Sequence, residues 1–420
     1  MFLPQKCVAN AYIRTGIFVE RMEYFFWIGL FIIFYTYIGY GIVLYVIIRC
    51  KRFMVKRPAA FPEDVNRLPS CTVIVAAYNE ASIMQQKIDN TLGLRYPADR
   101  IQYIFVTDGS TDESPEMVRK HAEIKLLHQP ARNGKIAAVH RAMKEVTTEV
   151  VVFTDANTLL NTDALIAICK HYQDERIGAV AGEKRVYAGA EADASAAGEG
   201  FYWKYESTLK KWDSELYSVV GTAGELFSIR CSLYESVPSD TVLDDFMISM
   251  QIAEKGHLVK YEPQAFATEM ASENVKEELK RKIRIAAGGI QSIIRLKRLL
   301  NPFSYPILSF QYISHRVLRW TLTPILLPIV FVLGAVLYSS QGGWLYAVLF
   351  YGQVLFYGLS LLGFLLERKA LKLKVAFIPY YFCVMNYAVL AGMIRYFTGG
   401  QSAIWERSNR KQSFEAGYNR

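Results

Sequence analysis

The distribution of apolar and polar positions divides the chain into three parts. From about Met22 to Ile48 the residues are apolar, and no charged side chain follows Glu23 in this run. A helix needs roughly 20 such residues to cross a bilayer, so the run predicts one transmembrane helix in an N-terminal region of residues 1–57. The length of the run and the absence of a small-residue cleavage site after it argue against a signal peptide.

The middle part, residues 58–300, has the composition of a soluble domain. Short apolar runs that predict buried strands ("CTVIVAAYN", "IQYIFVTD" and "VVVFTD") alternate with segments of helical periodicity ("EASIMQQKIDNTL", "ESPEMVRKHA" and "KIAAVHRAMKEV"). This alternation predicts an α/β fold with a mostly parallel sheet and helices on both of its faces.

Long apolar runs return near the C-terminus. Three of them are long enough to cross a bilayer and predict three transmembrane helices within residues 321–398: Thr321 to Tyr338, Leu345 to Leu366 and Val375 to Ile394. Before them, residues 301–320 mix aromatic side chains with Arg316 and Arg319, which predicts an interfacial helix lying on the membrane. A further crossing in this segment is the alternative, and the two arginines argue against it.

The flanking charges predict an orientation. Arg49, Lys51 and Arg52 follow the first apolar run, so the positive-inside rule places the middle domain in the cytosol, at a bacterial inner membrane. The basic tail, residues 399–420, prefers the same side, yet one span plus three spans would put it on the other. A hidden crossing in residues 301–320, a re-entrant last segment or an exception to the rule would each resolve this conflict.

The composition narrows the function classes. Of the 420 residues, 52% are hydrophobic and 21% are charged, with a net charge of +9, which suits a soluble domain joined to helices in a lipid bilayer. No zinc finger, helix-turn-helix pattern or Arg-rich arm is present, so we expect no nucleic-acid partner. The six cysteines are scattered without a C-x-x-C pair, which argues against a disulfide framework and a zinc site.

Two predicted strands end in an aspartate, at Asp108 and Asp155. Ligands of open α/β sheets bind at the carboxyl ends of the strands, so both carboxylates are expected to face one cleft. The alternative for each aspartate is a helix N-cap. "TDAN" places Asp155 and Asn157 two residues apart at a turn, and these oxygens are suitable ligands for Mg²⁺ or Mn²⁺ together with substrate phosphates.

Further candidate residues follow downstream. "TVLDDF" contributes Asp244 and Asp245, of which one can act as a general base while the other caps the next helix. "NGK" places Lys135 at a predicted helix start, where amides and an ammonium suit a phosphate. The basic helix around Arg284 has two interpretations: it lies on the anionic membrane surface, or Arg284 reaches a pyrophosphate.

Together these motifs, from about Leu68 to Arg284, resemble the family 2 inverting glycosyltransferases that carry transmembrane helices, such as hyaluronan, chitin, cellulose and poly-N-acetylglucosamine synthases. The resemblance implies a GT-A fold, a nucleoside diphosphate sugar donor, with a UDP-sugar expected, and Mg²⁺ or Mn²⁺ as cofactor. It also implies that the nucleotide-sugar pocket includes Ala77, Tyr78, Glu80, Asp108 and Lys135.

The remaining roles come from the same resemblance. Asp155 and Asn157 occupy the D-x-D position that holds the metal, and Asp155 also contacts the nucleotide sugar. Asp245 matches the base that deprotonates the acceptor hydroxyl, and Arg284 matches the arginine of Q-x-x-R-W, which serves the diphosphate.

We expect the acceptor to lie near Gly224, Glu225 and Asp244. The loops near Tyr202–Trp212 and Gly221–Glu225 are expected to select the sugar and the acceptor.

The chain departs from the family pattern in two places. Asn157 replaces the second metal aspartate and lowers the charge of the site. The Q-x-x-R-W position has Arg281 for the glutamine and Ile285 for the tryptophan, which argues against processive synthesis. We therefore predict a membrane-embedded transferase for cell-surface glycan synthesis that glycosylates a lipid-linked or polysaccharide acceptor. A processive synthase that translocates its polymer, or a non-catalytic nucleotide-sugar-binding subunit of a membrane complex, is the alternative.

Overall fold

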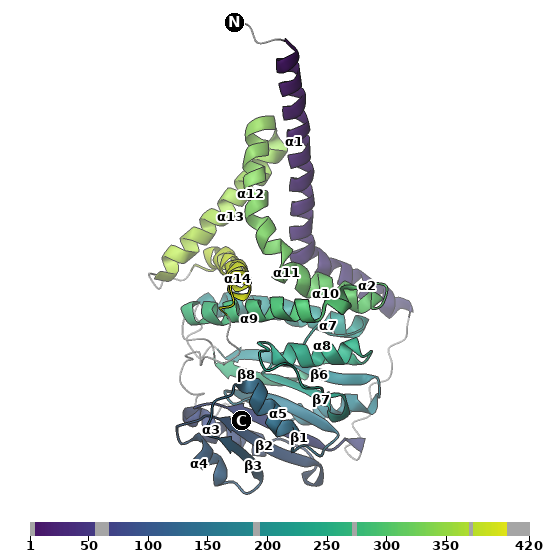
Figure 1. The fold of residues 1–420 in the computed structure, drawn as a ribbon, viewed down its shortest axis with the longest axis vertical. Coiled ribbons are helices and arrows are strands. Elements are labelled where there is room, and N and C mark those ends of the chain that lie inside the picture. Colours follow the sequence, from purple (N-terminus) through teal and green to yellow (C-terminus); the bar gives the residue numbers. More distant parts are fainter. Residues whose placement is uncertain (1–4, 55–66, 188–193, 271–274, 369–372, 401–420) are drawn as a thin grey trace.

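A computed structural model describes residues 5–54, 67–187, 194–270, 275–368 and 373–400 of the chain. In this part of the chain, an α/β domain lies at one end and long helices extend away from it (Figure 1). The predicted basic tail lies almost entirely outside the described residues, as does most of the expected N-terminal boundary of the soluble domain.

The α/β domain is built on one sheet of eight strands with the order β3-β2-β1-β4-β7-β6-β8-β5. The pairs β1–β2, β1–β4, β2–β3 and β6–β8 are parallel, whereas β7 is antiparallel to both of its neighbours and β5 is antiparallel to β8. The strands are β1 (Cys71–Ala77), β2 (Ile101–Asp108), β3 (Ile124–Gln129), β4 (Val150–Asp155), β5 (Thr158–Leu160), β6 (Ile177–Tyr187), β7 (Leu226–Arg230) and β8 (Leu258–Met270). The predicted mostly parallel sheet is confirmed.

Both faces of the sheet are covered, because its central strands are apolar on both sides. All seven residues of β1 are buried; one hydrophobic core includes Cys71, Val73, Val75 and Ala77, and the core on the other face includes Ile74. Helices α3 (Ala81–Leu92), α4 (Ser114–Arg119) and α6 (Ala164–Cys169) pack in one core, and α5 (Lys135–Met143) and α8 (Asp244–Glu254) pack in the other. The predicted alternation of strands and helices therefore forms a sheet with helices on both of its faces.

Two longer helices, α7 (Ala194–Leu216) and α9 (Val275–Arg295), lie between the sheet and the extended helices (Figure 1). The segment Tyr202–Trp212, expected to act as a loop, lies inside α7. This correction has a simple cause, because the segment contains neither glycine nor proline to end a helix.

The N-terminal apolar run forms a bent helix. α1 (Gln5–Phe34) and α2 (Tyr40–Met54) are joined by the π-helical turn η1 (Tyr35–Gly39). α1 extends away from the α/β domain, whereas α2 runs along it (Figure 1). Tyr40 and Leu44 of α2 are buried against Leu209 of α7, so packing on the α/β domain accounts for the bend within the expected span of residues 22–48.

The segment expected to lie on the membrane is helical. It consists of α10 (Pro306–Tyr312), η7 (Ile313–Val317) and α11 (Leu318–Trp320), and it lies near α2 at the level where the long helices meet the domain (Figure 1). Single helical turns occur at η3 (Ala98–Arg100), η4 (Lys170–Gln173), η5 (Cys231–Leu233) and η6 (Lys297–Leu300).

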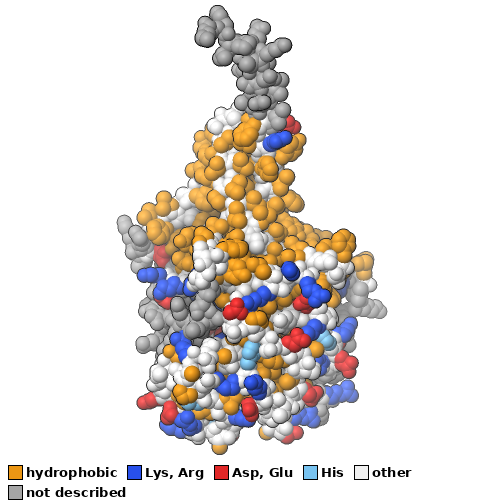
Figure 2. All heavy atoms as spheres, in the orientation of Figure 1, with side chains coloured by type: hydrophobic (Ala, Val, Ile, Leu, Met, Phe, Trp, Pro, Cys, Tyr) orange, Lys and Arg blue, Asp and Glu red, His pale blue; other side chains and the backbone are white. Residues whose placement is uncertain are grey.

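Within the described residues, four helices are long and apolar enough to cross a membrane: Phe18–Met54, Leu322–Gln341, Trp344–Glu367 and Val375–Phe397. They contain α1 with α2, α12 (Leu322–Gln341), α13 (Trp344–Arg368) and α14 (Lys374–Phe397). Figure 2 shows that apolar side chains cover the extended part of the molecule and that Lys and Arg gather below it, beside the α/β domain. Membrane-spanning helices joined to a GT-A-like domain are thus consistent with the structure.

α14 contacts both the N-terminal helical region and α9. Near its middle, Asn386 accepts a hydrogen bond of 2.5 Å from Tyr37, at the base of α1. Near its end, a Cβ atom on Gly392 would lie 2.6 Å from the Cβ of Ala286 in α9. α14 therefore packs closely against α9 near its C-terminal end.

Candidate active site

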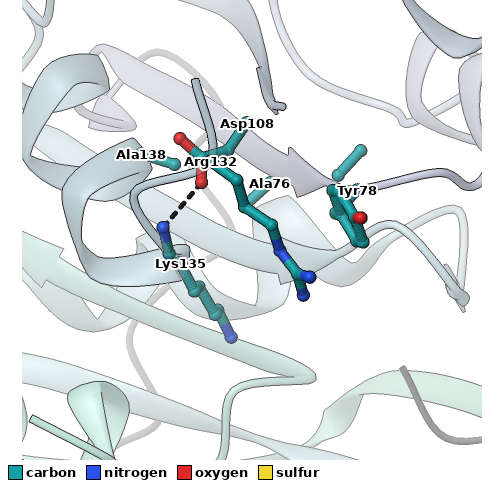
Figure 3. Close-up of a pocket in the computed structure, with 8 residues that line it drawn as sticks. Ala76, Tyr78, Asp108, Arg132, Lys135 and Ala138 are labelled. Atoms are coloured by element: carbon teal, nitrogen blue, oxygen red, sulfur yellow. Dashed lines mark hydrogen bonds between the residues drawn. The ribbon is translucent and has the colours of Figure 1, made fainter. Parts of the chain in front are cut away.

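A small pocket lies at the carboxyl ends of β1 and β2 and the start of α5 (Figure 3). Its lining residues are Ala76, Ala77, Tyr78, Asp108, Arg132, Gly134, Lys135 and Ala138. The loop before α5 approaches β2 closely, since a Cβ atom on Gly109 would lie 2.7 Å from the Cβ of Arg132. Gly109 also has a φ of 71°, which a residue with a side chain rarely adopts.

Asp108 connects the end of β2 to the turn before α5. One of its carboxylate oxygens, Oδ2, accepts hydrogen bonds from the backbone N–H groups of Asn133 at 2.9 Å and Gly134 at 2.7 Å. The other oxygen, Oδ1, is buried and accepts no hydrogen bond, with the nearest cation, Arg141, at 3.7 Å. Asp108 thus stabilises the turn before α5, in agreement with the alternative role as a helix cap. Its second oxygen, Oδ1, is an available acceptor on the wall of the small pocket.

Arg132 forms the opposite wall of this pocket. Its guanidinium lies 3.8 Å from the centre of the Tyr78 ring, a stacked cation–π contact. Sequence reasoning missed Arg132, although it directly precedes the "NGK" turn and is therefore carried into the pocket with Lys135.

Four charged side chains converge where this pocket meets a second, larger cavity. The Lys135 ammonium lies 2.7 Å from Asp155 Oδ1 and 4.0 Å from Asp244 Oδ2. A Cβ atom on Gly224 would lie 3.0 Å from Lys135 Nζ, 3.7 Å from Asp245 Oδ2 and 3.8 Å from Asp155 Oδ2. Residues from β4, α5, α8 and the turn before β7 therefore surround one point beside Gly224.

The electrostatic setting of Asp245 suits proton transfer. Burial and the neighbouring Asp244 carboxylate raise the pKa of Asp245 to about 7, against the opposing effect of Lys135. Burial alone would lower the pKa of the Lys135 ammonium, but Asp155, Asp244 and Asp245 raise it well above its usual value. Near neutral pH the site therefore holds a charged lysine and an aspartate that can gain or lose a proton.

The second cavity has a volume of about 600 Å³ and extends from these residues to the membrane helices. Glu225 lies on its wall in a buried ion network with Lys184 at 2.7 Å and Arg281 at 2.9 Å. Burial raises the pKa of Glu225, but the charges of Lys184 and Arg281 outweigh this effect and hold it at about 2. Glu269 joins the network from β8.

The predicted site residues fall into three groups. Ala77, Tyr78, Asp108 and Lys135 line the small pocket, and the large cavity is lined by Lys135, Asp155, Gly224, Glu225, Asp244, Asp245 and Arg284. Glu80 and Asn157 line neither, and Glu80 is buried at the start of α3.

The turn after β4 offers one oxygen donor that fits a metal ligand. Asn157 Oδ1 is buried and accepts no hydrogen bond, and Asn157 lies in the turn that follows Asp155. An acceptor of this kind fits a cation ligand. The described residues contain no group of three or more His, Cys, Asp or Glu side chains that would hold a metal by themselves. A cation here would take most of its other ligands from phosphate or water, as Mg²⁺ does.

At the Q-x-x-R-W position, the structure explains the departures. Arg281, at the glutamine position, pairs with Glu225 rather than standing alone on the wall. Ile285, at the tryptophan position, lines the cavity, and a tryptophan from elsewhere also lines it. This residue, Trp320 of α11, lies 5.3 Å from the ring of Phe246 and above Gly289, where a Cβ atom would come within 2.6 Å. The motif alone does not reveal this substitution, because Trp320 comes from a distant segment.

Comparison with known proteins agrees with the fold and the site. Residues 72–237 match Glycosyl transferase family 2, and this part of the chain is a family 2 glycosyltransferase domain. The predicted resemblance to the membrane-bound family 2 glycosyltransferases is confirmed.

Among curated proteins, the chain is similar to poly-β-1,6-N-acetyl-D-glucosamine synthases of Staphylococcus. It is 25% identical to the Staphylococcus epidermidis protein over 61% of this chain and 62% of that protein. It is 26% identical to the Staphylococcus aureus protein over 55% of this chain and 57% of that protein. The chain thus spans about three fifths of the length of these relatives.

Among solved structures, the chain resembles a mannosyltransferase from Pyrobaculum calidifontis, PcManGT, in complex with GDP-Man and Mn²⁺. The TM-score is 0.67 with 24% sequence identity, and the match covers 90% of this chain and 100% of that chain. This likeness, which includes the flanking helices, confirms the predicted GT-A fold with membrane helices.

Proposed function

We propose that the protein transfers a sugar from a nucleoside diphosphate sugar to a hydroxyl of a membrane-associated acceptor, with inversion at the anomeric carbon. The observation that carries this proposal is the convergence of Lys135, Asp155 and Asp245 around Gly224. This point lies between the small pocket at the carboxyl ends of β1 and β2 and a large cavity that reaches the membrane helices. A transferase needs this arrangement, because donor and acceptor must enter from different sides of one reacting centre.

The small pocket is proposed to bind the nucleoside. Asp108 Oδ1 is a buried acceptor without a hydrogen bond, so it favours a base that offers a ring N–H group. Uracil and guanine have such a group, whereas the corresponding ring nitrogen of adenine and cytosine is an acceptor. This supports the expected UDP-sugar and also admits a GDP-sugar, the donor type in the P. calidifontis neighbour.

A divalent cation, Mg²⁺ or Mn²⁺, is proposed to be held by Asp155, with Asn157 as a neutral oxygen ligand and the donor's phosphates completing the set. When bound, such an ion neutralises the charge that develops on the departing diphosphate. The solved neighbour contains Mn²⁺, which supports this choice of metal.

Separate residues of the chain would accept the proton and stabilise the leaving group. Asp245 takes the proton of the acceptor hydroxyl as that oxygen forms its bond to the anomeric carbon. The bond from this carbon to the donor phosphate breaks, and Lys135 and Arg284 stabilise the nucleoside diphosphate that leaves. Glu80 is proposed to act only through the position of the β1 turn, since it is buried there.

Formation of a polysaccharide is the second candidate function. It is favoured by the relatives, which are named as poly-β-1,6-N-acetyl-D-glucosamine synthases, and by a cavity larger than one sugar requires. We retain a single or short addition as the first candidate, because Arg281 and Ile285 replace the glutamine and tryptophan of Q-x-x-R-W. The length of the product distinguishes the two.

A donor screen on purified full-length protein in detergent tests the proposal. The measurement is release of nucleoside diphosphate from UDP-, GDP-, ADP- and CDP-sugars, with Mn²⁺ or Mg²⁺ and with chelator. We expect turnover with a UDP- or GDP-sugar and loss of turnover with chelator. Turnover that persists unchanged in chelator would overturn the metal assignment, and preference for ADP- or CDP-sugars would overturn the role of Asp108.

A further inference from the structure

Lys87 is a fully buried lysine near the candidate site. It lies on α3, is 0% exposed and lines neither the small pocket nor the large cavity. Its side-chain nitrogen donates hydrogen bonds to the backbone carbonyl of Thr158 at 2.8 Å and to Oγ1 of Thr154 at 3.0 Å. Among the described residues, no carboxylate forms an ion pair with it. A lysine buried among neutral groups is costly, so its place in the fold needs an explanation.

The protonation of Lys87 reflects this cost. Burial lowers the pKa of the ammonium to about 7, and the negative charge of Asp155 opposes the shift. The neutral amine still carries two N–H groups, one for each of the two acceptors. The two hydrogen bonds are therefore available to the lysine in both of its protonation states.

The two acceptors enclose the turn that carries the candidate metal ligands. Thr154 directly precedes Asp155 in β4. Thr158 begins β5, and Asn157 lies in the turn before it. The Thr158 hydroxyl donates a hydrogen bond of 2.9 Å to the backbone carbonyl of Asp155. Lys87 thus binds both ends of this turn from a position outside the two cavities.

The hydroxyl of Thr154 links Lys87 to a second turn. It accepts the hydrogen bond from the lysine and donates its O–H group to the backbone carbonyl of Glu225 at 3.0 Å. Glu225 follows Gly224, the residue beside which the charged side chains of the site converge. One lysine is therefore connected, directly or through a single hydroxyl, to both turns that meet at the reacting centre.

Asn90 provides a comparison on the same helix. It lies about one turn after Lys87, and its side chain both donates to the carbonyl of Leu160 and accepts from the N–H group of that residue, at 2.8 Å each. Leu160 is the last residue of β5, at the end of the strand away from Asp155. These hydrogen bonds already join α3 to β5, so attachment of the helix alone does not explain a buried lysine.

We propose that Lys87 is a positioning residue that fixes the turn of residues 155–158 and the turn of residues 224–225 relative to each other. A cation and the donor's diphosphate need oxygen atoms of fixed geometry at this point. The inference rests on the proposed function, because it concerns the same site. Lys87 acts through Thr154 and Thr158 and contacts neither cavity. Loss of its side chain should therefore weaken the binding that depends on the cation and leave the nucleoside pocket unchanged.

Nucleotide binding to the full chain in detergent tests this role without turnover. Isothermal titration measures the dissociation constants of UDP and GDP with Mn²⁺ and with chelator, and the ratio of the two constants is the gain in affinity due to Mn²⁺. The variants are Lys87→Met, Thr154→Val and their combination. Thr154→Ser keeps the hydroxyl, and Asn90→Leu is the matched control that removes another contact between α3 and β5. The unfolding temperature of each variant is recorded.

We expect Mn²⁺ to tighten UDP or GDP binding to the native chain, and Lys87→Met to reduce this gain by about tenfold or more. Thr154→Val is nearly isosteric and should lose part of the same gain, so it tests the link even if Lys87→Met does not fold. The combined variant should lose no more than Lys87→Met, because both changes break one chain of hydrogen bonds.

The two controls separate this role from a contribution to stability. Thr154→Ser and Asn90→Leu should keep the gain, even if Asn90→Leu lowers the unfolding temperature. Affinity in chelator should be the same in all variants, because Lys87 shares no contact with the pocket at the ends of β1 and β2.

Three outcomes would overturn the inference. These are an unchanged gain in Lys87→Met and Thr154→Val, an equal loss of the gain in Lys87→Met and Asn90→Leu, and a weaker affinity of Lys87→Met in chelator. If the native chain shows the gain and Lys87→Met keeps it, the proposed function stands and only this inference fails. If Mn²⁺ gives the native chain no gain with either nucleotide, the proposed metal-dependent transfer fails, and the inference fails with it.

Discussion

The Lys135 ammonium lies 2.7 Å from Asp155 Oδ1, so the lysine and the carboxylate at the end of β4 form an ion pair in the centre of the candidate site. Both side chains are about four-fifths buried, at 21% and 18% exposure, so the pair is only weakly screened by water. Lys135 and a divalent cation would therefore compete for the same carboxylate. Lys135 would have to turn away from Asp155 for this carboxylate to hold a cation.

We first predict that Lys135→Met strengthens metal binding and weakens catalysis. Without the ammonium, Asp155 is available to the cation, and a charge-assisted hydrogen bond of roughly 1.5–3 kcal/mol no longer opposes binding. The dissociation constant for Mn²⁺ in the absence of donor should fall about tenfold or more. Isothermal titration with Mn²⁺ measures this, and steady-state turnover should fall in parallel. An unchanged or weaker Mn²⁺ affinity would show that the two cations do not share Asp155.

A second prediction concerns the base. Asp245→Asn keeps the size of the side chain but cannot accept the acceptor's proton, so kcat should fall by about 10²–10⁴ while donor affinity stays within a few-fold. Asp240→Asn is the matched control, because Asp240 is an exposed carboxylate near the same helix, paired with Arg295. Release of nucleoside diphosphate measures both variants. Full activity in Asp245→Asn would remove this residue from the base role.

The third prediction is a pH dependence. Asp245 must be deprotonated to act as base, and its pKa is about 7, so kcat/KM for the acceptor should rise with pH up to about pH 7 and level off above it. Burial and Asp244 raise this pKa. Asp244→Asn removes a negative charge, which lowers the pKa of Asp245 and should move the acid limb of the profile to lower pH. A shift to higher pH in Asp244→Asn would contradict the assignment.

A fourth prediction addresses the nucleoside. In Asp108→Asn, the amide oxygen can keep the hydrogen bonds from Asn133 and Gly134, while an NH₂ donor replaces the available acceptor Oδ1. Affinity for UDP and GDP should fall by about 10²-fold, and affinity for CDP should rise relative to UDP. Competition binding with the four nucleoside diphosphates measures the change. Equal losses for all four would indicate a structural role alone.

The fifth prediction concerns the packing of α14 against α9. Gly392→Ala adds a Cβ atom that would lie 2.6 Å from the Cβ of Ala286 and 2.8 Å from backbone atoms of α9. Such overpacking costs about 1–3 kcal/mol, so the unfolding temperature should fall and α14 should shift from the cavity wall. Gly358→Ala on α13 is the control, since no atom lies within 4 Å of its added Cβ. Equal unfolding temperatures of the two variants would contradict the close contact.

Much of the architecture was predictable, because its signals are local. The strands that end at Asp108 and Asp155 appear as unbroken apolar runs, and the helix that begins at Lys135 follows a glycine. The C-terminal apolar runs correspond to α12, α13 and α14 within a few residues at each end. Strand-end geometry also predicted that Asp108 and Asp155 face one cleft; in the structure Asp108 lines the small pocket and Asp155 the large cavity, and Lys135 lines both.

The course of the long helices was not predictable in the same way. The hydropathy of the sequence shows that α14 is apolar enough to cross a bilayer. It does not show that Gly392 allows the backbone of α14 to lie against α9. The bend between α1 and α2 likewise depends on the packing of Tyr40 and Leu44 against α7. These contacts join residues more than a hundred positions apart, so no local pattern encodes them.

By itself, the sequence determined the α/β class, the strand-end carboxylates, the Lys135 turn and the presence of long apolar helices, because each depends on periodicity or spacing within a few residues. Only the tertiary structure decided that Asp155, Asp245 and Lys135 meet beside Gly224. It also decided that Trp320 lines the cavity. The physical reason is that burial and counter-charge are properties of packing, which depends on how distant segments come together in space.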